Sequence, residues 1–338
     1  MTCFSNPGQL GFSMPAEWEE HERCWMAWPS RHDFWDDIAS SRQDYANVAN
    51  AIAGFEPVTM VVRPEDSASA RSLLDPNVSL LELLIDDSWA RDSGPTFVVG
   101  PGNQLAATAW RFNAWGNKHR PWFDDAKLAN RIASSLEIPV YPSPLVFEGG
   151  GLAVDGEGSV LVTESVILND NRNPGITRKE AEQELCQALG VTNVIWLPGD
   201  WHEYETDGHV DGLACFVRPG VILYETNPDP DDPHSAVLAE NLIALQKARD
   251  ARGKAFELVP IVEASAADGV GDIFCRSYIN FYIANGGIVA PAYEIDSDAE
   301  VRELLTALFP GRIVKMININ NIAPGGGGIH CITQQQPA

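Results

Sequence analysis

The most reactive side chain in the sequence is a cysteine near the end of the chain. Cys331 follows the run Gly325-Gly326-Gly327-Gly328 and comes directly after His330. Four consecutive glycines lose much conformational entropy on ordering, so we expect them where the backbone approaches a ligand closely or takes a positive φ. Gly327 and Gly328 are therefore predicted to contact a bound molecule, and Cys331 to be a nucleophile. A buried structural thiol is the alternative.

A histidine and an aspartate stand two residues apart in Asp207-Gly208-His209-Val210-Asp211. In an extended strand such residues point to the same side, so we expect His209 and Asp211 to face one pocket. Histidine is the acid/base of neutral pH, and a neighbouring carboxylate favours its protonated form. The same pair occurs in metal sites, but no further His or Cys stands in register, so no metal is predicted. A structural surface histidine is the alternative.

Two further carboxylates stand beside glycines. Asp92 lies in Trp-Ala-Arg-Asp-Ser-Gly-Pro, where an aspartate that bonds the nearby backbone is the alternative interpretation. Glu148 lies between the apolar Leu-Val-Phe and three glycines, a costly place for a carboxylate without a cationic partner. Carboxylates complement a planar guanidinium, whose N–H donors come in pairs. We therefore expect a cationic ligand at these acids.

Together, a thiol, an imidazole and carboxylates indicate attack by sulfur on the central carbon of a guanidinium, with a covalent amidino intermediate. A free cysteine is mostly protonated at neutral pH, so the site must lower the thiol pKa or use the positive charge of the substrate. His209 would protonate the departing nitrogen, which leaves as ammonia, and would then deprotonate water. This chemistry needs no metal and no cofactor.

The charge balance narrows the class of ligand. The 338 residues include 23 Lys and Arg against 47 Asp and Glu, a net charge of -24. This balance argues against nucleic acids and anionic membranes and favours neutral or cationic partners, although solubility is an alternative reason for it. The sequence lacks an apolar run long enough to span a membrane and a signal-peptide pattern, so we expect a cytoplasmic protein. Six cysteines without a C-x-x-C pair indicate neither a disulfide framework nor a zinc site.

Five segments have the spacing of amphipathic helices, and each is followed by an apolar, β-rich run. The helices are predicted over 36–54, 121–137, 177–190, 233–253 and 298–309, and the runs over 57–63, 138–141, 191–197, 256–262 and 312–319. Thr177 and Glu180 form a capping-box pattern, and Pro121 and Pro233 stand where a first helical turn tolerates proline.

Glycine-centred turns predict a second recurring element, a β-hairpin. The paired strands are 96–99 with 105–110, 152–154 with 159–163, 213–217 with 221–224 and 278–283 with 288–291, and a fifth hairpin would begin at Ile329. The polar motifs stand just before these hairpins. The repeat predicts an α/β fold, a five-fold pseudo-symmetric α/β propeller with the reactive residues at its axis, closed by a strand over 21–28. Without a linker we expect one catalytic domain over 1–338, and two α/β domains are the alternative.

The motifs resemble those of the agmatine deiminases, in the guanidino-group-modifying enzyme superfamily and close to the Porphyromonas-type peptidylarginine deiminases. The resemblance runs nearly end to end, from Met-Pro-Ala-Glu-Trp-Glu-Glu-His at 14–21 to Gly-Gly-Ile-His-Cys-Ile-Thr-Gln-Gln around Cys331. It implies a five-fold α/β propeller (pentein) and hydrolysis of agmatine to N-carbamoylputrescine and ammonia.

The resemblance also implies a role for each motif residue. These roles are nucleophile for Cys331, acid/base for His209, guanidinium binding for Asp92 and Asp211, and pocket lining for Trp89 and Glu148, with Glu148 assisting the histidine or the cation. Three departures each remove a polar contact from the pocket rim: Gly328 and Gly212 stand where the family has Asn, and Gly151 where it has Ser.

Other readings stay open at this point. The substrate is expected to be a small cationic guanidine, and the rivals to agmatine are arginine, methylated arginines, peptidyl arginine and guanidinobutyrate. A carboxylate-bearing substrate would need an arginine in the pocket, for which Arg91 and Arg276 are candidates. An amidinotransferase would share the first half-reaction, and a non-catalytic binding module on the same fold would need no thiol opposite a histidine. A homodimer is a candidate assembly.

Overall fold

Four of the sheets share one construction, a hairpin of two antiparallel strands followed by a third strand parallel to the second. The computed structural model describes residues 6–267 and 273–338 and shows a mixed α/β fold. The strands of these sheets are β4 (Thr96–Gly100), β5 (Gln104–Arg111) and β6 (Val140–Val146); β7 (Leu152–Val154), β8 (Ser159–Thr163) and β9 (Asn193–Leu197); β10 (Ala214–Arg218), β11 (Val221–Thr226) and β12 (Glu257–Val262); and β13 (Tyr282–Ala284), β14 (Gly287–Ala292) and β15 (Ile313–Asn318). The four predicted hairpins are confirmed, but the first strand of the last one covers Tyr282–Ala284 and not the predicted 278–283.

The remaining sheet joins the two ends of the chain. Its order is β16 (Thr333–Pro337), β1 (His21–Ala27), β2 (Val58–Val62) and β3 (Ser79–Glu82). β16 is antiparallel to β1, and β2 and β3 continue the sheet in parallel. The fifth hairpin expected from Ile329 is therefore wrong, because the partner of the last strand is the first strand, and the strand expected over 21–28 is confirmed.

Five longer helices precede the third strands of the sheets, as the spacing predicts. They are α1 (Ile38–Ala53), α5 (Leu128–Ser135), α7 (Arg178–Leu189), α8 (Pro233–Lys247) and α9 (Ser297–Leu308). The capping box of Thr177 and Glu180 is present, and Gly190 ends α7 with a φ of 67°. The sequence pattern did not predict α2 (Ser67–Leu73).

Two helix boundaries differ from the prediction. The segment from 121 forms only a 3-10 turn, η3 (Asp125–Lys127), before α5 begins. The helix predicted to 253 ends at Lys247 because Ala248 is extended and the Asp250 carboxylate accepts hydrogen bonds from the backbone of Arg252 and Lys254. Such a turn competes with helical hydrogen bonding.

Among the short helical elements, those that begin at Ala90, Gly149 and Val210 lie directly ahead of hairpins, where polar motifs were found. The short elements are α3 (Ala90–Ser93), α4 (Ala114–Asn117), α6 (Glu164–Ile167), η1 (Gly8–Leu10), η2 (Pro64–Asp66), η4 (Gly149–Gly151), η5 (Val210–Gly212) and η6 (Ala323–Gly325). α3 contacts η4, and η4 contacts η5, so three of the motifs meet although they are far apart in sequence.

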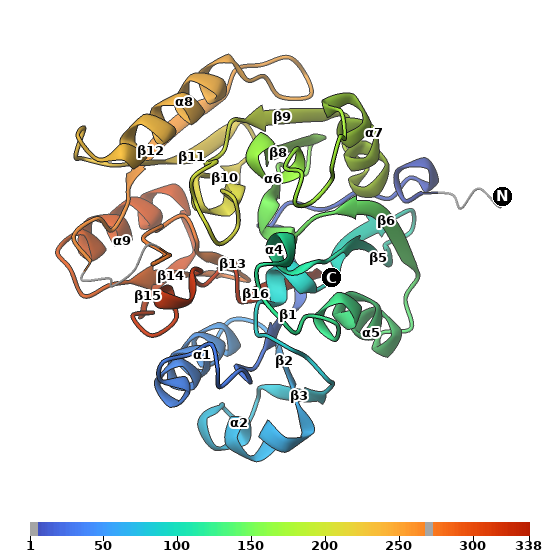
Figure 1. Cartoon of the computed structure of the whole chain (residues 1–338), viewed down its shortest axis with the longest axis vertical. Helices are drawn as coiled ribbons and strands as arrows, with labels where there is room; N and C mark the ends of the chain where they lie inside the picture. The colour runs from blue at the N-terminus through green and yellow to red at the C-terminus, as the bar shows by residue number, and fades with distance from the viewer. Residues whose placement is uncertain (1–5, 268–272) are drawn as a thin grey trace.

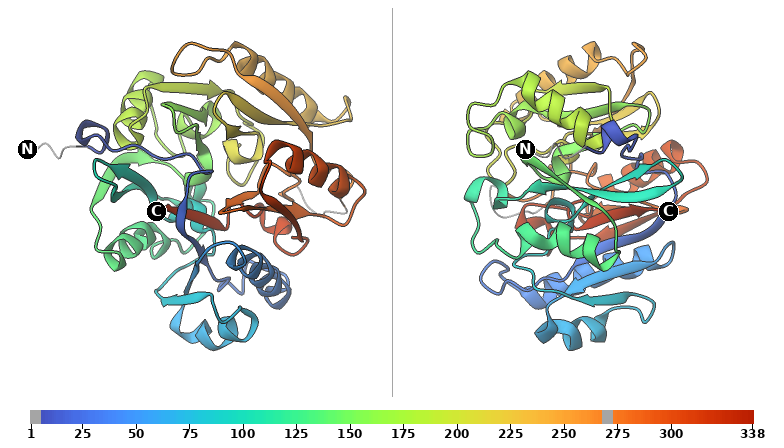
Figure 2. Two further views of the ribbon diagram at one scale, coloured as in Figure 1. Left: turned by 180° about the vertical axis from the view of Figure 1, so that it is seen from behind. Right: turned by 90° about the vertical axis from the view of Figure 1, so that its right-hand side faces the viewer.

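The sheets surround the middle of the molecule, and the longer helices lie at the outside (Figure 1). Seen from behind, the N-terminal segment crosses the middle of the fold and the C-terminus lies beside it (Figure 2). In the described ranges, the helices are all too short or too polar to cross a membrane.

Candidate active site

Three of the predicted residues converge on one backbone position, and a fourth, Cys331, lies beside one of the three. A Cβ atom on Gly150 would lie 2.6 Å from Nδ1 of His209 and 2.9 Å from both Oδ2 of Asp211 and Oδ1 of Asp92. The N–H of Gly150 donates to Oδ1 of Asp92 at 2.8 Å. The Sγ atom of Cys331 lies 3.7 Å from Oδ2 of Asp211. Only a glycine at position 150 leaves room for the imidazole and both carboxylates.

The approach of His209 and Asp211 has a different local origin from the one predicted. The residues do not form an extended strand, because His209 is the N-cap of the 3-10 turn η5. Gly208 precedes it with a φ of 82°, packed against the backbone of Asp200. The N–H of His209 donates to Oγ1 of Thr206 at 3.1 Å. This turn, rather than strand alternation, directs both side chains to Gly150.

Glu148 already has a cationic partner within the chain. Its Oε1 accepts a hydrogen bond from Nε of Arg172 at 2.8 Å, and its Oε2 lies 3.3 Å from Nε2 of His209. Burial opposes the charge, but Arg172 and His209 lower the pKa of Glu148 to about 2. Glu148 therefore faces the imidazole. The sequence-based expectation that its burial calls for a substrate cation is wrong, because Arg172 is its cationic partner. Sequence reasoning missed Arg172.

His209 carries a proton at neutral pH in this setting. Burial acts against the imidazolium, but Asp92 and Glu148 outweigh it and raise the pKa of His209 to about 9. Nδ1 lies 3.9 Å from Oδ1 of Asp92, and within the described residues it has no hydrogen-bond partner. That nitrogen is available to a bound molecule.

Cys331 is buried, with 7% of its surface exposed. Burial, together with the charges of Asp211 and Asp92, raises the pKa of the Cys331 thiol well above its usual value. The amide of Asn280 lies against it: Nδ2 donates to Sγ at 3.2 Å, and Oδ1 accepts from the N–H of Cys331 at 3.2 Å. In the protein alone the sulfur is therefore a neutral thiol.

Asn280 is a site residue that sequence reasoning missed. It interrupts an apolar run between Ile279 and Phe281, and that lone amide was the available signal. A Cβ atom on Gly328 would lie 2.7 Å from Oδ1 of Asn280. Gly328 therefore makes room for Asn280, and its contact with a ligand stays a prediction.

A buried chain of ion pairs fixes Asp211 from behind. Nδ1 of His330 lies 2.7 Å from Oδ2 of Asp211, and Nε2 of His330 lies 2.9 Å from Oε1 of Glu17. Arg91 donates to the same oxygen of Glu17 at 3.2 Å. Burial opposes the charge of Asp211, but the bond from His330 lowers its pKa. Arg91 thus holds Glu17 and is not placed to bind a carboxylate of the substrate.

A cavity of about 300 Å³ opens over Cys331. Its lining includes the aromatic rings of Phe34, Trp89 and Trp115, the backbone of 325–327 and the carboxylates of Asp92 and Glu205. Trp89 and Gly327 line it, whereas His209, Asp211, Glu148 and Gly328 are not among its lining residues.

The charges of the lining residues are mainly negative. Among the described residues that line the cavity there is no Lys or Arg. The ring of His119 is bonded through Nε2 to Oε2 of Glu205 at 2.7 Å. The second candidate for binding a carboxylate, Arg276, lies over the ring of Phe274 at 5.5 Å and does not line the cavity. These walls suit a cationic ligand.

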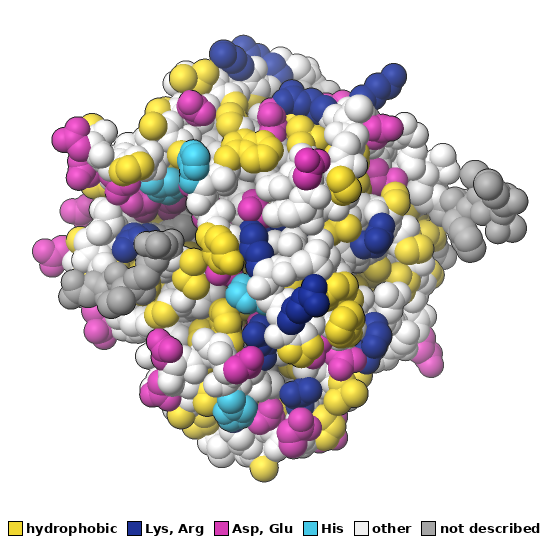
Figure 3. All heavy atoms as spheres, viewed as in Figure 1, with side chains coloured by type: hydrophobic (Ala, Val, Ile, Leu, Met, Phe, Trp, Pro, Cys, Tyr) yellow, Lys and Arg dark blue, Asp and Glu magenta, His cyan; other side chains and the backbone are white. Residues whose placement is uncertain are grey.

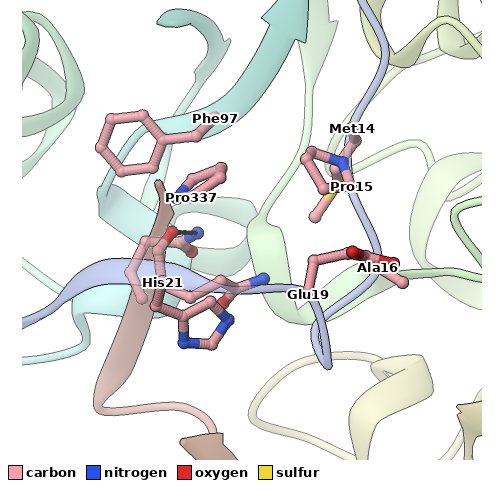
Figure 4. Close-up of a pocket in the computed structure, with 9 residues that line it drawn as sticks. Met14, Pro15, Ala16, Glu19, His21, Phe97 and Pro337 are labelled. Carbon is pink, nitrogen blue, oxygen red and sulfur yellow. Dashed lines mark hydrogen bonds between the residues drawn. The ribbon is translucent and has the colours of Figure 1, made fainter. Parts of the chain in front are cut away.

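Two other cavities lie away from this opening. One of about 390 Å³ reaches Asp211 and His330 past Glu17 and is otherwise largely apolar. Another, of about 250 Å³, lies between the N-terminal segment and the end of the chain, beside Met14, His21 and Pro337 (Figure 4). None of the predicted site residues lines the cavity of Figure 4.

The fold and the cluster define a class: a mixed α/β protein in which a thiol, an imidazole and carboxylates meet at one cavity, as attack on a cationic carbon requires. The model of the Porphyromonas-type peptidyl-arginine deiminase family matches residues 13–337, and the chain belongs to this family.

Similar proteins span almost the whole chain. An agmatine deiminase of Stutzerimonas stutzeri is 42% identical over 100% of this chain and 98% of its own length. The solved structure of an agmatine deiminase of Enterococcus faecalis has a TM-score of 0.96 at 34% identity, covering 99% of this chain and 98% of the other. DDAH of Pseudomonas aeruginosa, in complex with citrulline, has a TM-score of 0.52 at 12% identity, covering 94% and 99%, which shows likeness of fold alone.

Proposed function

We propose that the protein is a hydrolase that converts agmatine to N-carbamoylputrescine and ammonia through a covalent amidino group on Cys331. The observation that carries this proposal is the convergence of a thiol, an imidazolium and two carboxylates beside one acidic, aromatic-walled cavity. Membership of the deiminase family and the relatives named agmatine deiminase support it.

The first half-reaction follows from the charges. A guanidinium bound by Asp92 and Asp211 offsets the negative charges that raise the thiol pKa, so Cys331 loses its proton to solvent through the cavity as the substrate enters. Sulfur then bonds to the guanidinium carbon. His209, protonated at neutral pH, gives its proton to the leaving nitrogen as the C–N bond breaks, and ammonia departs.

The second half-reaction reuses the same groups. His209, now neutral, takes a proton from water as the water oxygen bonds to the amidino carbon. The S–C bond then breaks, the remaining hydroxyl proton passes to the departing sulfur, and the ureido product leaves Cys331 as a thiol again. Glu148 and Arg172 keep the imidazole in place through the bond at Nε2. Over both half-reactions one water is consumed and one ammonia is released. No electrons are exchanged with an outside group.

The cavity lining supports agmatine over its rivals. Agmatine has a second cationic end, and Glu205 offers a second carboxylate in the same cavity as Asp92. Arginine and guanidinobutyrate bring a carboxylate instead, which would meet these acids without a Lys or Arg among the described lining residues. Glu205 is therefore proposed to select the terminal ammonium.

We also infer that the chain is one catalytic domain over 1–338, a five-fold pseudo-symmetric propeller. The shared hairpin-plus-parallel-strand construction of four sheets supports the repeat, and the pairing of β1 with β16 supports closure. Three of the motifs that carry the chemistry stand just ahead of the first strands β4, β7 and β10, which would place them around one axis.

The proposed function is tested by an ammonia-release assay over a panel of guanidines, with wild type and Cys331→Ser compared. We expect agmatine to have the highest kcat/KM, and Cys331→Ser to lower kcat by at least about a thousandfold while agmatine still binds. Cys186→Ser is the matched control, because Cys186 is a free thiol on α7 that does not line the cavity. Unchanged turnover in Cys331→Ser would refute the mechanism, and a preference for arginine would refute the substrate.

A further inference from the structure

A second cluster of ionisable side chains lies outside the thiol site. Glu225 near the end of β11, His234 in the first turn of α8 and Glu263 directly after β12 each place one oxygen or ring nitrogen within 4.8 Å of the others. β11 and β12 are parallel neighbours that pair Thr226 with Val262, so both glutamates reach the same edge of the sheet. Asp232 caps α8 and brings His234 over that edge.

The carboxylate of Glu225 has an unmet need for a positive partner. Its residue is 4% exposed, and in the described part of the chain Oε1 has no hydrogen-bond partner. Glu263 is 6% exposed and lies beside it. Two buried carboxylates side by side repel each other, and an unpaired buried charge is costly, so the pair keeps its charge only beside a cation and otherwise takes up a proton.

Hydrogen-bonding and charged neighbours surround the cluster in the way that second partners surround metal ligands. Nδ1 of His234 lies 2.9 Å from Oε2 of Glu263, and the other ring nitrogen, Nε2, lies 3.9 Å from Oδ2 of Asp200. Nδ2 of Asn227 donates to the second oxygen of Glu263 at 2.7 Å. A ligating histidine commonly has a carboxylate at its other nitrogen, and a ligating carboxylate commonly accepts a further hydrogen bond.

We propose that Glu225, His234 and Glu263 bind one divalent cation of the zinc type. One imidazole nitrogen and two carboxylate oxygens suit Zn²⁺ better than Mg²⁺ or Ca²⁺, which prefer oxygen ligands throughout. The cation ties β11, α8 and β12 together and stabilises that part of the fold. It takes no part in deimination, and its ligands are separate from the thiol site.

The competing occupant of this space is a proton, carried by His234 or by Glu225, since burial and the charge of Glu263 raise the pKa of Glu225 to about 8. Burial disfavours the imidazolium, but Glu263 and Glu225 raise the pKa of His234 to about 9, so a protonated ring would also counter the two carboxylates. The two cases differ in one measurable respect, because an imidazolium leaves no ligand atom on Nδ1 for a metal.

Equilibrium dialysis of the full chain against Zn²⁺ distinguishes them. Wild type should bind one equivalent of Zn²⁺. Glu225→Gln and His234→Ala should each bind Zn²⁺ at least tenfold more weakly. Glu240→Gln is the matched control, since Glu240 is exposed on the same helix and outside the cluster, and it should bind as wild type does.

Thermal unfolding supplies the second readout. Zn²⁺ should raise the Tm of wild type and Glu240→Gln but not that of the two cluster variants. Circular dichroism at 20 °C checks that each variant is folded, and Glu263→Gln replaces any that is not. Equal zinc binding in wild type and in the cluster variants would assign the metal to thiols and overturn the proposal. The absence of zinc binding in wild type would overturn it too.

Discussion

At the scale of the residue, the carboxylates set where the protons lie before the reaction begins. Burial and the charges of Asp211 and Asp92 keep Cys331 a thiol, and Asp92 and Glu148 keep His209 an imidazolium. The cysteine is therefore unreactive until a cation enters. Such a site protects its thiol from oxidation and alkylation, and it ties activation to the arrival of the guanidinium.

This account predicts slow alkylation of Cys331 by iodoacetamide at neutral pH. Because the pKa of the thiol is raised, the rate should still be rising at pH 9, and Asp92→Asn should react several times faster than wild type at pH 8. Peptide mass spectrometry after timed quenching gives the rate for each cysteine. A rate in wild type that is already level at pH 7 would show a resting thiolate and contradict the account.

At the scale of the element, short turns ahead of hairpins do the positioning. The sequence indicated where these motifs lie, because glycines and polar residues stand out against apolar strands, but it did not indicate that they form turns. It could not indicate Arg172 or Glu17, since a buried partner is defined by contacts across the fold and not by spacing. The same limit explains why Asn280 was missed and why the geometry of His209 was attributed to a strand.

Gly150 tests this positioning most directly. Replacing it with alanine would place a Cβ atom within 3 Å of His209, Asp211 and Asp92, so the side chains must move apart. We expect Gly150→Ala to lower kcat by at least about a hundredfold, the usual cost of a displacement near 1 Å.

Gly212→Ala is the control for that substitution. Gly212 lies in the neighbouring turn η5, and a Cβ atom there meets nothing within 4 Å. Its kcat and its Tm should stay near those of wild type. An active Gly150→Ala enzyme, or equal losses in both variants, would contradict the proposed geometry.

At the scale of the whole molecule, two features concern the site: the pairing of the first and last strands, and the distribution of the net charge. β16 begins two residues after Cys331 and pairs with β1, so the nucleophile is fixed by a contact between the first and last strands. The net charge is -24, yet on the face of Figure 3 acidic and basic side chains are interspersed. We therefore expect the carboxylates that line the cavity to contribute most to the binding of a cation.

Salt dependence measures how far the overall charge contributes. Agmatine carries two positive charges, so its kcat/KM should fall more steeply between low and high salt than that of a guanidine with zero net charge. The ammonia assay at several NaCl concentrations gives both slopes. Equal slopes would assign the acidic surplus to solubility alone.

The central claim is the covalent amidino intermediate on Cys331, and mass spectrometry of His209→Ala incubated with agmatine tests it most directly. Without His209 ammonia leaves slowly, but water is not activated either, so the intermediate that forms during a long incubation should persist. The peptide that contains Cys331 should gain the mass of one amidino group, and Cys331→Ser in the same background should gain none. An adduct on another cysteine, or full turnover without any adduct, would contradict the account.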